Sequence, residues 1–379
     1  MKKLRIGVIF GGRSGEHEVS MASAASILDH LDRDRYEAVP IRIAKDGRWH
    51  LTAAAPGTLA PAVTLEQRDA SPDDGVETYP LARPGTTTLL TISRQPDGDS
   101  GAAISRLALD VVFPVLHGPY GEDGTMQGLL ELANVPYVGA GVLGSAVGMD
   151  KAVMKVLFAA HGLPIVQHVA FLGHEWRGGR DNMVTRIAST LGFPVFVKPA
   201  NLGSSVGISR AQTAEDLVTG VDLALQFDRK VVVEAAVPHA REIECAVLGN
   251  DVPEASVPGE IVPSRDFYDY ESKYLDGTSR EIIPAPLDED QSAAVRRMAL
   301  DAFRAVDCSG MARVDFLLDS RSGALFLNEI NTIPGFTTIS MYPKLWKATG
   351  LSYPALLDRL IALALERHAA KQLLRTSLT

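Results

Sequence analysis

The alternation of apolar and polar positions predicts a parallel α/β arrangement at the start of the chain. Residues 4–10 form a short apolar run that ends at a glycine pair, residues 21–31 have helical spacing, and residues 36–43 predict the next strand. A further buried strand is expected at 107–116, followed by a helix at 125–134. Strands and helices that alternate in this way are typical of a parallel sheet.

Residues 53–100 do not follow this alternation. They are rich in alanine, proline, glycine, threonine and aspartate, and their hydrophobic periodicity is weak. Turn-forming residues without periodic apolar positions are typical of loops. We therefore expect a surface insertion in this part of the chain.

The rest of the chain predicts a second set of helices and strands, in which a glycine- and serine-rich loop at 201–207 directly follows a strand. Apolar positions at intervals of three and four indicate helices, and short apolar runs between turn residues indicate strands. We expect a helix at 142–160, strands at 194–199, 230–237 and 241–248, a helix with one buried face around 295–306, and a hairpin of strands at 313–318 and 324–330.

Length and charge limit the classes of function. A chain of 379 residues is long enough for roughly two to three domains. Its formal net charge of -9 argues against a general nucleic-acid binder, because such proteins need a basic face. An anionic substrate would therefore have to be held by individual lysine and arginine side chains.

The cysteines and the apolar runs indicate a cytoplasmic protein. Cys245 and Cys308 are far apart and belong to no CxxC or Cys/His cluster, so neither a zinc site nor a disulfide framework is expected. The apolar run after the N-terminal lysines ends at Gly11, too early for a signal peptide. No apolar run is long enough to span a membrane.

Two local patterns suggest nucleotide and metal chemistry. The loop at 201–207 follows the strand that carries Lys198, and glycine lets backbone N–H groups approach phosphate oxygens, although a plain turn is the more common explanation of such a loop. Asp315 lies on one strand of the hairpin, and Glu329 and Asn331 lie on one face of the other. Hard oxygen ligands between apolar neighbours favour Mg²⁺ or Mn²⁺; a solvated hairpin end is the alternative.

Six strings in order along the chain closely resemble the D-alanine–D-alanine ligase family. The resemblance covers nearly the whole chain apart from residues 53–100. The strings are His17-Glu18-Val19-Ser20, His117-Gly118-Pro119-Tyr120-Gly121-Glu122-Asp123-Gly124, Met149-Asp150-Lys151, Val197-Lys198-Pro199, Gly203-Ser204-Ser205-Val206-Gly207 and Asn328-Glu329-Ile330-Asn331-Thr332-Ile333-Pro334-Gly335-Phe336-Thr337.

The resemblance implies an α/β protein with the ATP-grasp fold and an N-terminal parallel-sheet domain. The expected domains are 1–141 with the first D-alanine site, 142–237 as the central subdomain, and 238–379 with the metal site and a lid loop. ATP would lie between the last two. The implied ATP-binding residues are Lys151, Lys198, Ser204, Glu234, Ala235, Val237, Glu242, Lys273, Asn328 and Glu329. Many members have lysine where this chain has Ala235, a departure expected to matter little because the backbone contacts adenine there.

The resemblance also implies roles at the reacting groups. Glu18 and His117 would hold the first D-alanine, and Gly335 and Ser340 the second. The catalytic set would be Glu18, Ser204, Tyr274 and Arg313, with Asp315, Glu329 and Asn331 as ligands of two Mg²⁺ ions that Mn²⁺ can replace. Structural alternatives are a first-turn helix acid for Glu18, a packed strand-end histidine for His117 and a helix cap for Ser340.

The implied reaction joins two D-alanines through a D-alanyl phosphate, for peptidoglycan precursor synthesis. Another ATP-grasp carboxylate–amine ligase, including a D-alanine–D-lactate ligase, and a non-catalytic nucleotide-binding protein are the alternatives. Tyr274, at a position where D-lactate-using relatives commonly have histidine, favours the dipeptide. D-alanine and ATP are the expected partners, without nucleic acid or membrane; the oligomeric state is open, with a homodimer as one arrangement.

Overall fold

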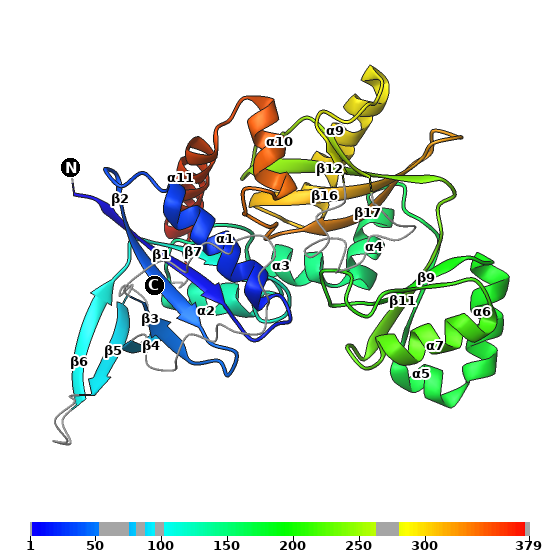
Figure 1. Cartoon of the computed structure of the whole chain (residues 1–379), viewed down its shortest axis with the longest axis horizontal. Helices are drawn as coiled ribbons and strands as arrows, with labels where there is room; N and C mark the ends of the chain where they lie inside the picture. Colours follow the sequence, from blue (N-terminus) through cyan, green and yellow to red (C-terminus); the bar gives the residue numbers. More distant parts are fainter. Residues whose placement is uncertain (1, 53–75, 81–87, 95–101, 263–279, 376–379) are drawn as a thin grey trace.

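Three β-sheets follow one another along the chain (Figure 1). The computed structural model describes residues 2–52, 76–80, 88–94, 102–262 and 280–375. In the first sheet, β1 (Leu4–Gly11) pairs in parallel with β2 (Tyr36–Ile43) and β7 (Val111–Val115). The parallel α/β arrangement expected from the sequence is therefore confirmed.

The first sheet is larger than the sequence suggested. Its order is β6-β5-β4-β3-β2-β1-β7, and residues 53–100, expected to be a surface insertion, contribute β4 and β5 to it. The expected strand at 107–116 is also two strands. The additional antiparallel strands are β3 (Trp49–Leu51), β4 (Val76–Pro80), β5 (Thr88–Arg94) and β6 (Ala102–Ala108). Short strands at a sheet edge need few apolar positions, so their hydrophobic pattern is weak.

The helix expected at 142–160 is interrupted, so that Lys151 begins a new helix. The two helices are α3 (Val142–Met149) and α4 (Lys151–Ala160). Between them, Asp150 has an extended backbone, and its side chain accepts hydrogen bonds from the N–H groups of Ala152 and Val153. Such a capping aspartate satisfies the free N–H groups of a helix start and therefore favours the break.

The second sheet is small and antiparallel, with the order β10-β9-β11-β8. Its helices pack on the sheet through a cluster that includes Trp176, Ile187 and Leu217. The strands are β8 (His168–Leu172), β9 (Val195–Pro199), β10 (Ser209–Ala211) and β11 (Lys230–Ala235); the helices are α5 (Gly173–Gly178), α6 (Arg180–Leu191) and α7 (Ala214–Ala224).

The third sheet carries the expected hairpin and packs against α4. Met154 and Phe158 of α4 join Phe303 of α9 (Glu289–Ala305) in its core, so α4 lies between the second and third sheets (Figure 1). The strands are β12 (Ala240–Gly249), β13 (Glu254–Ala255), β14 (Gly259–Val262), β15 (Arg280–Ile282), β16 (Gly310–Asp319) and β17 (Leu325–Asn331).

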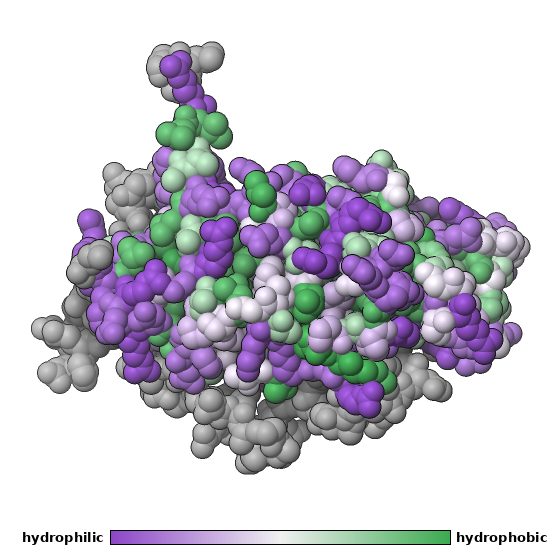
Figure 2. Space-filling view, turned by 90° about the horizontal axis from the view of Figure 1, so that it is seen from above, coloured by the Kyte–Doolittle hydropathy of each residue, from purple (hydrophilic) through white to green (hydrophobic). Residues whose placement is uncertain are grey.

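The C-terminal helices close the core of the first sheet. Leu356 and Leu360 of α11 (Tyr353–Gln372), which follows α10 (Met341–Thr349), share a buried cluster with Ile6 and Val8 of β1. No single helix in the described ranges is long and apolar enough to cross a membrane; α10 and α11 reach that length together only across a bend of 101°. Figure 2 shows hydrophobic residues in small groups among polar ones on the face it presents.

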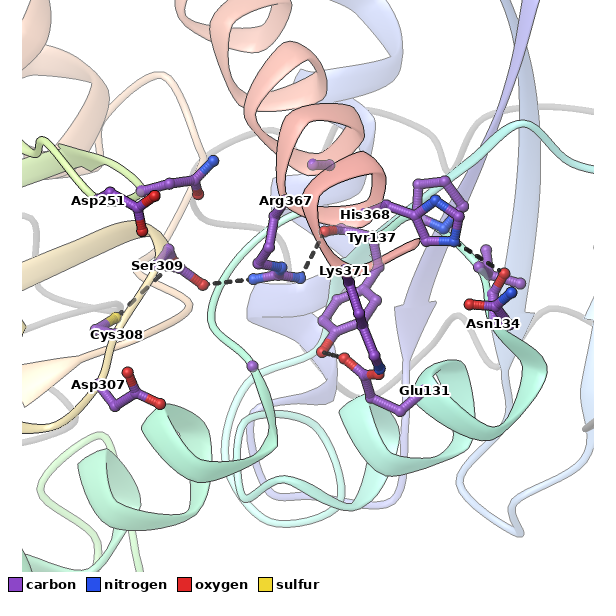
Figure 3. A pocket seen from close by; sticks show the side chains of 15 residues that line it. Glu131, Asn134, Tyr137, Asp251, Asp307, Cys308, Ser309, Arg367, His368 and Lys371 are labelled. Carbon is purple, nitrogen blue, oxygen red and sulfur yellow. Dashed lines mark hydrogen bonds and ion pairs between the residues drawn. The ribbon is translucent and has the colours of Figure 1, made fainter. Parts of the chain in front are cut away.

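Arg367 of α11 ties the first sheet to the third beside a pocket of about 260 Å³ (Figure 3). Its guanidinium donates to the carbonyl oxygens of Tyr137, at 3.0 Å, and Gly139, and to Ser309 Oγ at 2.6 Å. It also lies 4.4 Å from the centre of the Tyr137 ring. Burial lowers the pKa of Arg367. One charged group therefore donates hydrogen bonds to acceptors beside the first sheet, Tyr137 and Gly139, and beside the third, Ser309.

We expect Arg367→Met to destabilise the fold by roughly 3 kcal/mol, because charge-assisted bonds are lost and buried acceptors are left unsatisfied. Methionine keeps the length of the side chain. Arg359→Met, at an exposed position of the same helix, serves as the control. Denaturant unfolding of both variants measures the difference, and equal stability of the two would contradict the role of Arg367.

Candidate active site

A buried carboxylate between two lysines lies where α4 meets the second and third sheets. Glu234 of β11 is 2.9 Å from Lys155 Nζ and 2.7 Å from Lys198 Nζ, and its side chain is only 3% exposed. Burial opposes ionisation of Glu234, but the charges of Lys155 and then Lys198 outweigh it and lower its pKa to about 2. Asn328 of β17 accepts from both lysines, through its main-chain oxygen and its side chain.

Lys151 extends this row of charges towards the glycine- and serine-rich loop. Its ammonium lies 3.3 Å from Glu329 and donates to the carbonyl oxygen of Leu202 at 2.9 Å. In the loop, Ser204 and Ser205 have positive φ angles of 48° and 58°. The loop is therefore a tight backbone turn beside a buried lysine, rather than a loose connection.

The predicted metal ligands lie together at the end of the hairpin. Asp315 pairs with Glu329 and Arg313 with Asn331 across β16 and β17. Arg313 donates to both oxygens of Asp315, at 2.8 and 2.7 Å, and Asn331 Nδ2 donates to Oδ2 at 3.0 Å. Among the described residues, no group of three His, Cys, Asp or Glu side chains could hold a metal. A metal here would depend on two carboxylates and one amide.

Glu16, not Glu18, is the acid beside the Ser204 loop. Ser204 Oγ donates to Glu16 Oε1, and Glu16 is 8% exposed. Glu18 instead forms an ion pair with Lys45 at 2.8 Å, and its side chain is 29% exposed. Ser204, expected in the catalytic set together with Glu18, therefore bonds Glu16 instead. Glu16 precedes the first turn of α1 (His17–His30), and two residues correspond to about 200° of rotation around a helix.

Glycines allow the main chain to approach Glu16 closely. A Cβ atom at Gly118 would lie 2.5 Å from Glu16 Oε2, and one at Gly203 would lie 3.0 Å from it. Gly118 N also donates to Glu122 Oε1 at 2.8 Å. Burial, and then the charge of Glu16, raise the pKa of Glu122 to about 8. Both effects disfavour the charged form of Glu122.

The other predicted substrate residues lie on the segment after β17 or contact it. His117 is buried; its Nδ1 is 3.0 Å from the carbonyl oxygen of Ile333 and its Nε2 is 3.3 Å from Ser23 Oγ. Burial lowers the pKa of His117. Ser340 directly precedes α10, but its hydroxyl accepts from Thr337 N at 3.0 Å and makes no cap bond to the helix. A Cβ atom at Gly335 would lie 2.9 Å from Ser340 Oγ.

The residues expected near adenine and ribose lie at the junction of β11 and β12. Ala235 ends β11, Val237 follows it, and Glu242 lies on β12. Ala235 N donates to the carbonyl oxygen of Gln167 at 2.9 Å. Lys273, Tyr274 and the rest of the expected lid loop lie outside the described residues.

Sequence reasoning missed Lys155, Glu16 and Glu244. Lys155 lies one helical turn after Lys151, and its neighbours Met154 and Phe158 are core residues, so a lysine on that face was the available signal. Glu244 lies 3.2 Å from Arg313. Burial opposes the charge of Arg313, but Asp315 and then Glu244 outweigh it and raise its pKa.

Solved structures share this arrangement of sheets over almost the whole chain. The D-alanine–D-alanine ligase from Coxiella burnetii superimposes with a TM-score of 0.79 at 38% identity, covering 98% of this chain and 97% of that one. The VanG D-Ala:D-Ser ligase from Enterococcus faecalis gives 0.80 at 33% identity, covering 96% and 100%. The fold and the lysine-rich junction thus define an ATP-dependent ligase with the ATP-grasp fold.

The sequence comparisons identify the family. The family described as D-ala D-ala ligase N-terminus matches residues 5–140, and the one described as D-ala D-ala ligase C-terminus matches residues 157–362. A D-alanine–D-alanine ligase from Heliobacterium modesticaldum is 50% identical over 375 residues, covering 98% of this chain and 97% of the relative. The chain belongs to the D-alanine–D-alanine ligase family.

Proposed function

We propose that the protein joins two D-alanine molecules with ATP, through a D-alanyl phosphate, for peptidoglycan precursor synthesis. The observation that carries the proposal is the row of lysines that alternate with Glu234 and Glu329, ending beside Glu16. Cations so placed can neutralise a polyphosphate next to the site of a substrate ammonium. The location in the cytoplasm and the homodimer remain predictions from the sequence.

ATP is proposed to lie at the junction of the second and third sheets. Glu234 Oε1 is close to Lys155 but, among the described residues, accepts no well-directed hydrogen bond. A buried acceptor of this kind suits the 6-amino group of adenine. The carbonyl of Ala235 and the N–H of Val237 would bind the same ring edge, Glu242 the ribose, and Lys151 and Lys198 the α- and β-phosphates.

The hairpin end fits Mg²⁺, with Mn²⁺ as a substitute. Asp315, Glu329 and Asn331 offer hard oxygen donors, and both carboxylates already face cations, Arg313 and Lys151. Bound there, Mg²⁺ would supply positive charge to the transferred phosphoryl group. Arg313 and Lys151, through their ion pairs, would hold the oxygen atoms of Asp315 and Glu329 in place around the ion.

The two D-alanines are proposed to bind at two different groups of residues. Glu16 replaces Glu18 as the acid for the ammonium of the first D-alanine, because Glu16 faces the Ser204 loop and His117 lies nearby. Ser340 and the Gly335 N–H would hold the second. The bonds to Asp315 use Nε and Nη2 of Arg313, so Nη1 is the group that we assign to the oxyanion formed when the second amine attacks.

The proposed reaction predicts its product. Phosphate should be released from ATP on addition of D-alanine but not of L-alanine, and mass analysis should show D-alanyl-D-alanine. Competition with D-lactate and D-serine tests whether the protein is a ligase of the same fold with a different second substrate. Tyr274, which is expected in the lid, favours an amine nucleophile. A main product of D-alanyl-D-lactate at pH 7 would contradict the proposal.

Glu16 and Glu18 form a matched pair of variants. We expect Glu16→Gln to lower kcat/KM for D-alanine about 10- to 100-fold, because a charge-assisted contact to the ammonium is lost. Glu18→Gln removes only a partly exposed ion pair with Lys45, so kcat/KM for D-alanine should change less than about fivefold. ATP affinity should stay unchanged in both. Steady-state kinetics with each substrate varied in turn measure both losses. A larger loss in Glu18→Gln than in Glu16→Gln would assign the ammonium contact to Glu18.

The metal assignment predicts the behaviour of Glu329→Gln. A carboxamide is a weaker ligand than a carboxylate, so the apparent affinity for Mg²⁺ should fall about tenfold or more while the fold remains intact. Activity measured against Mg²⁺ concentration, with thermal unfolding as the control, tests this. Unchanged activity at limiting Mg²⁺ would rule Glu329 out as a ligand.

A further inference from the structure

Lys155 is a buried charge to which the proposed function assigns no substrate contact. It is 0% exposed and lies one helical turn after Lys151 on α4. Its ammonium is 2.9 Å from Glu234 Oε1 and donates to the carbonyl oxygen of Asn328 at 3.1 Å. Lys155 therefore joins α4 to β11 of the second sheet and to β17 of the third.

The two lysines on Glu234 differ in what they can reach. Lys198 contacts Glu234 Oε2 at 2.7 Å and has a side chain 11% exposed, whereas the side chain of Lys155 is fully enclosed. Of the two, only Lys198 has a surface that a ligand can meet. Lys198, at the position proposed for phosphate binding, is thus held by a protein carboxylate.

Movement of Lys198 to a phosphate would remove one cation from a buried carboxylate. A buried charge that loses its partner is strongly destabilised, so Lys198 would be retained by Glu234 if no second cation were present. Lys155 supplies that cation. Because Asn328 also accepts a hydrogen bond from it, Lys155 keeps its place when Lys198 leaves.

We propose that Lys155 is a positioning residue for the nucleotide: it keeps Glu234 paired and in place, so that Lys198 can pass from Glu234 to the phosphates of ATP. This inference rests on the proposed function. It also assigns different tasks to two lysines that contact the same carboxylate, since Lys198 binds the ligand and Lys155 binds only the protein.

The test uses Lys155→Met, which keeps the side-chain volume but removes the charge. We expect the Kd for ADP with Mg²⁺, measured by calorimetry, to rise about tenfold or more, because Lys198 stays on Glu234. The KM for ATP should rise in parallel, and the KM for D-alanine should not. Lys371→Met, which removes a lysine paired with Glu131 at the distant pocket, is the control. An unchanged Kd in Lys155→Met would overturn the inference.

A charge rescue separates positioning from simple packing. In the double variant Lys155→Met/Glu234→Gln the carboxylate is gone, Lys198 is released, and ADP affinity should recover at least several-fold over Lys155→Met. If the loss of ADP affinity in the double variant is only the sum of the losses in the two single variants, Lys155 acts through packing. If Lys155→Met does not fold, the double variant is compared with Glu234→Gln alone, in which the adenine contact is altered in the same way. Equal ADP affinity of the two supports the inference, because Lys155 then has no carboxylate to hold in place, and weaker binding by the double variant contradicts it. Failure of the wild-type chain to bind ADP would instead refute the proposed function.

Discussion

Compensation of the buried charge on Glu234 is the constraint on which the rest of the site depends. A carboxylate enclosed between two sheets needs cations in contact, and Lys155 and Lys198 provide them from α4 and β9. The ion pair of Lys155 with Glu234 also holds α4 against the second sheet, and the hydrogen bond from Lys155 to the carbonyl oxygen of Asn328 holds α4 against the third. The lysines that stabilise this junction are thus the same lysines that are proposed to bind or position a polyphosphate.

The break at Asp150 has consequences for the whole cluster. A continuous helix from 142 to 160 would place Lys151 in a helix interior, whereas the capped start puts it where α4 meets the loop after β9. Asp150 is in turn held by Lys230 at 2.5 Å, at the start of β11. One local capping interaction therefore aligns Lys151 with Glu329 and Lys155 with Glu234.

The first and third sheets meet through the C-terminal segment rather than through consecutive parts of the chain. Helix α11 completes the core of the first sheet, and Tyr353 at its start donates to the carbonyl oxygen of Phe336 at 2.5 Å. Phe336 follows Gly335, and its N–H bonds Ser23 of α1 at 3.2 Å. The segment that carries Gly335 and Ser340 is therefore held by the same helix that carries Glu16 at its start.

The sequence alone determined the features that depend on local pattern. The period of two along the hairpin put Glu329 and Asn331 on one face, close to Asp315. The apolar runs located β1, β2 and β9, and six ordered strings indicated the family. It could not distinguish Glu16 from Glu18, because both lie at one helix start and only the packing of the Ser204 loop and Gly118 decides which one faces inward. It also missed Lys155, since a lysine becomes a buried charge only when β11 and β17, distant in the chain, enclose it. Side-chain direction and charge burial arise from contacts between remote segments, and those were decided by the tertiary structure.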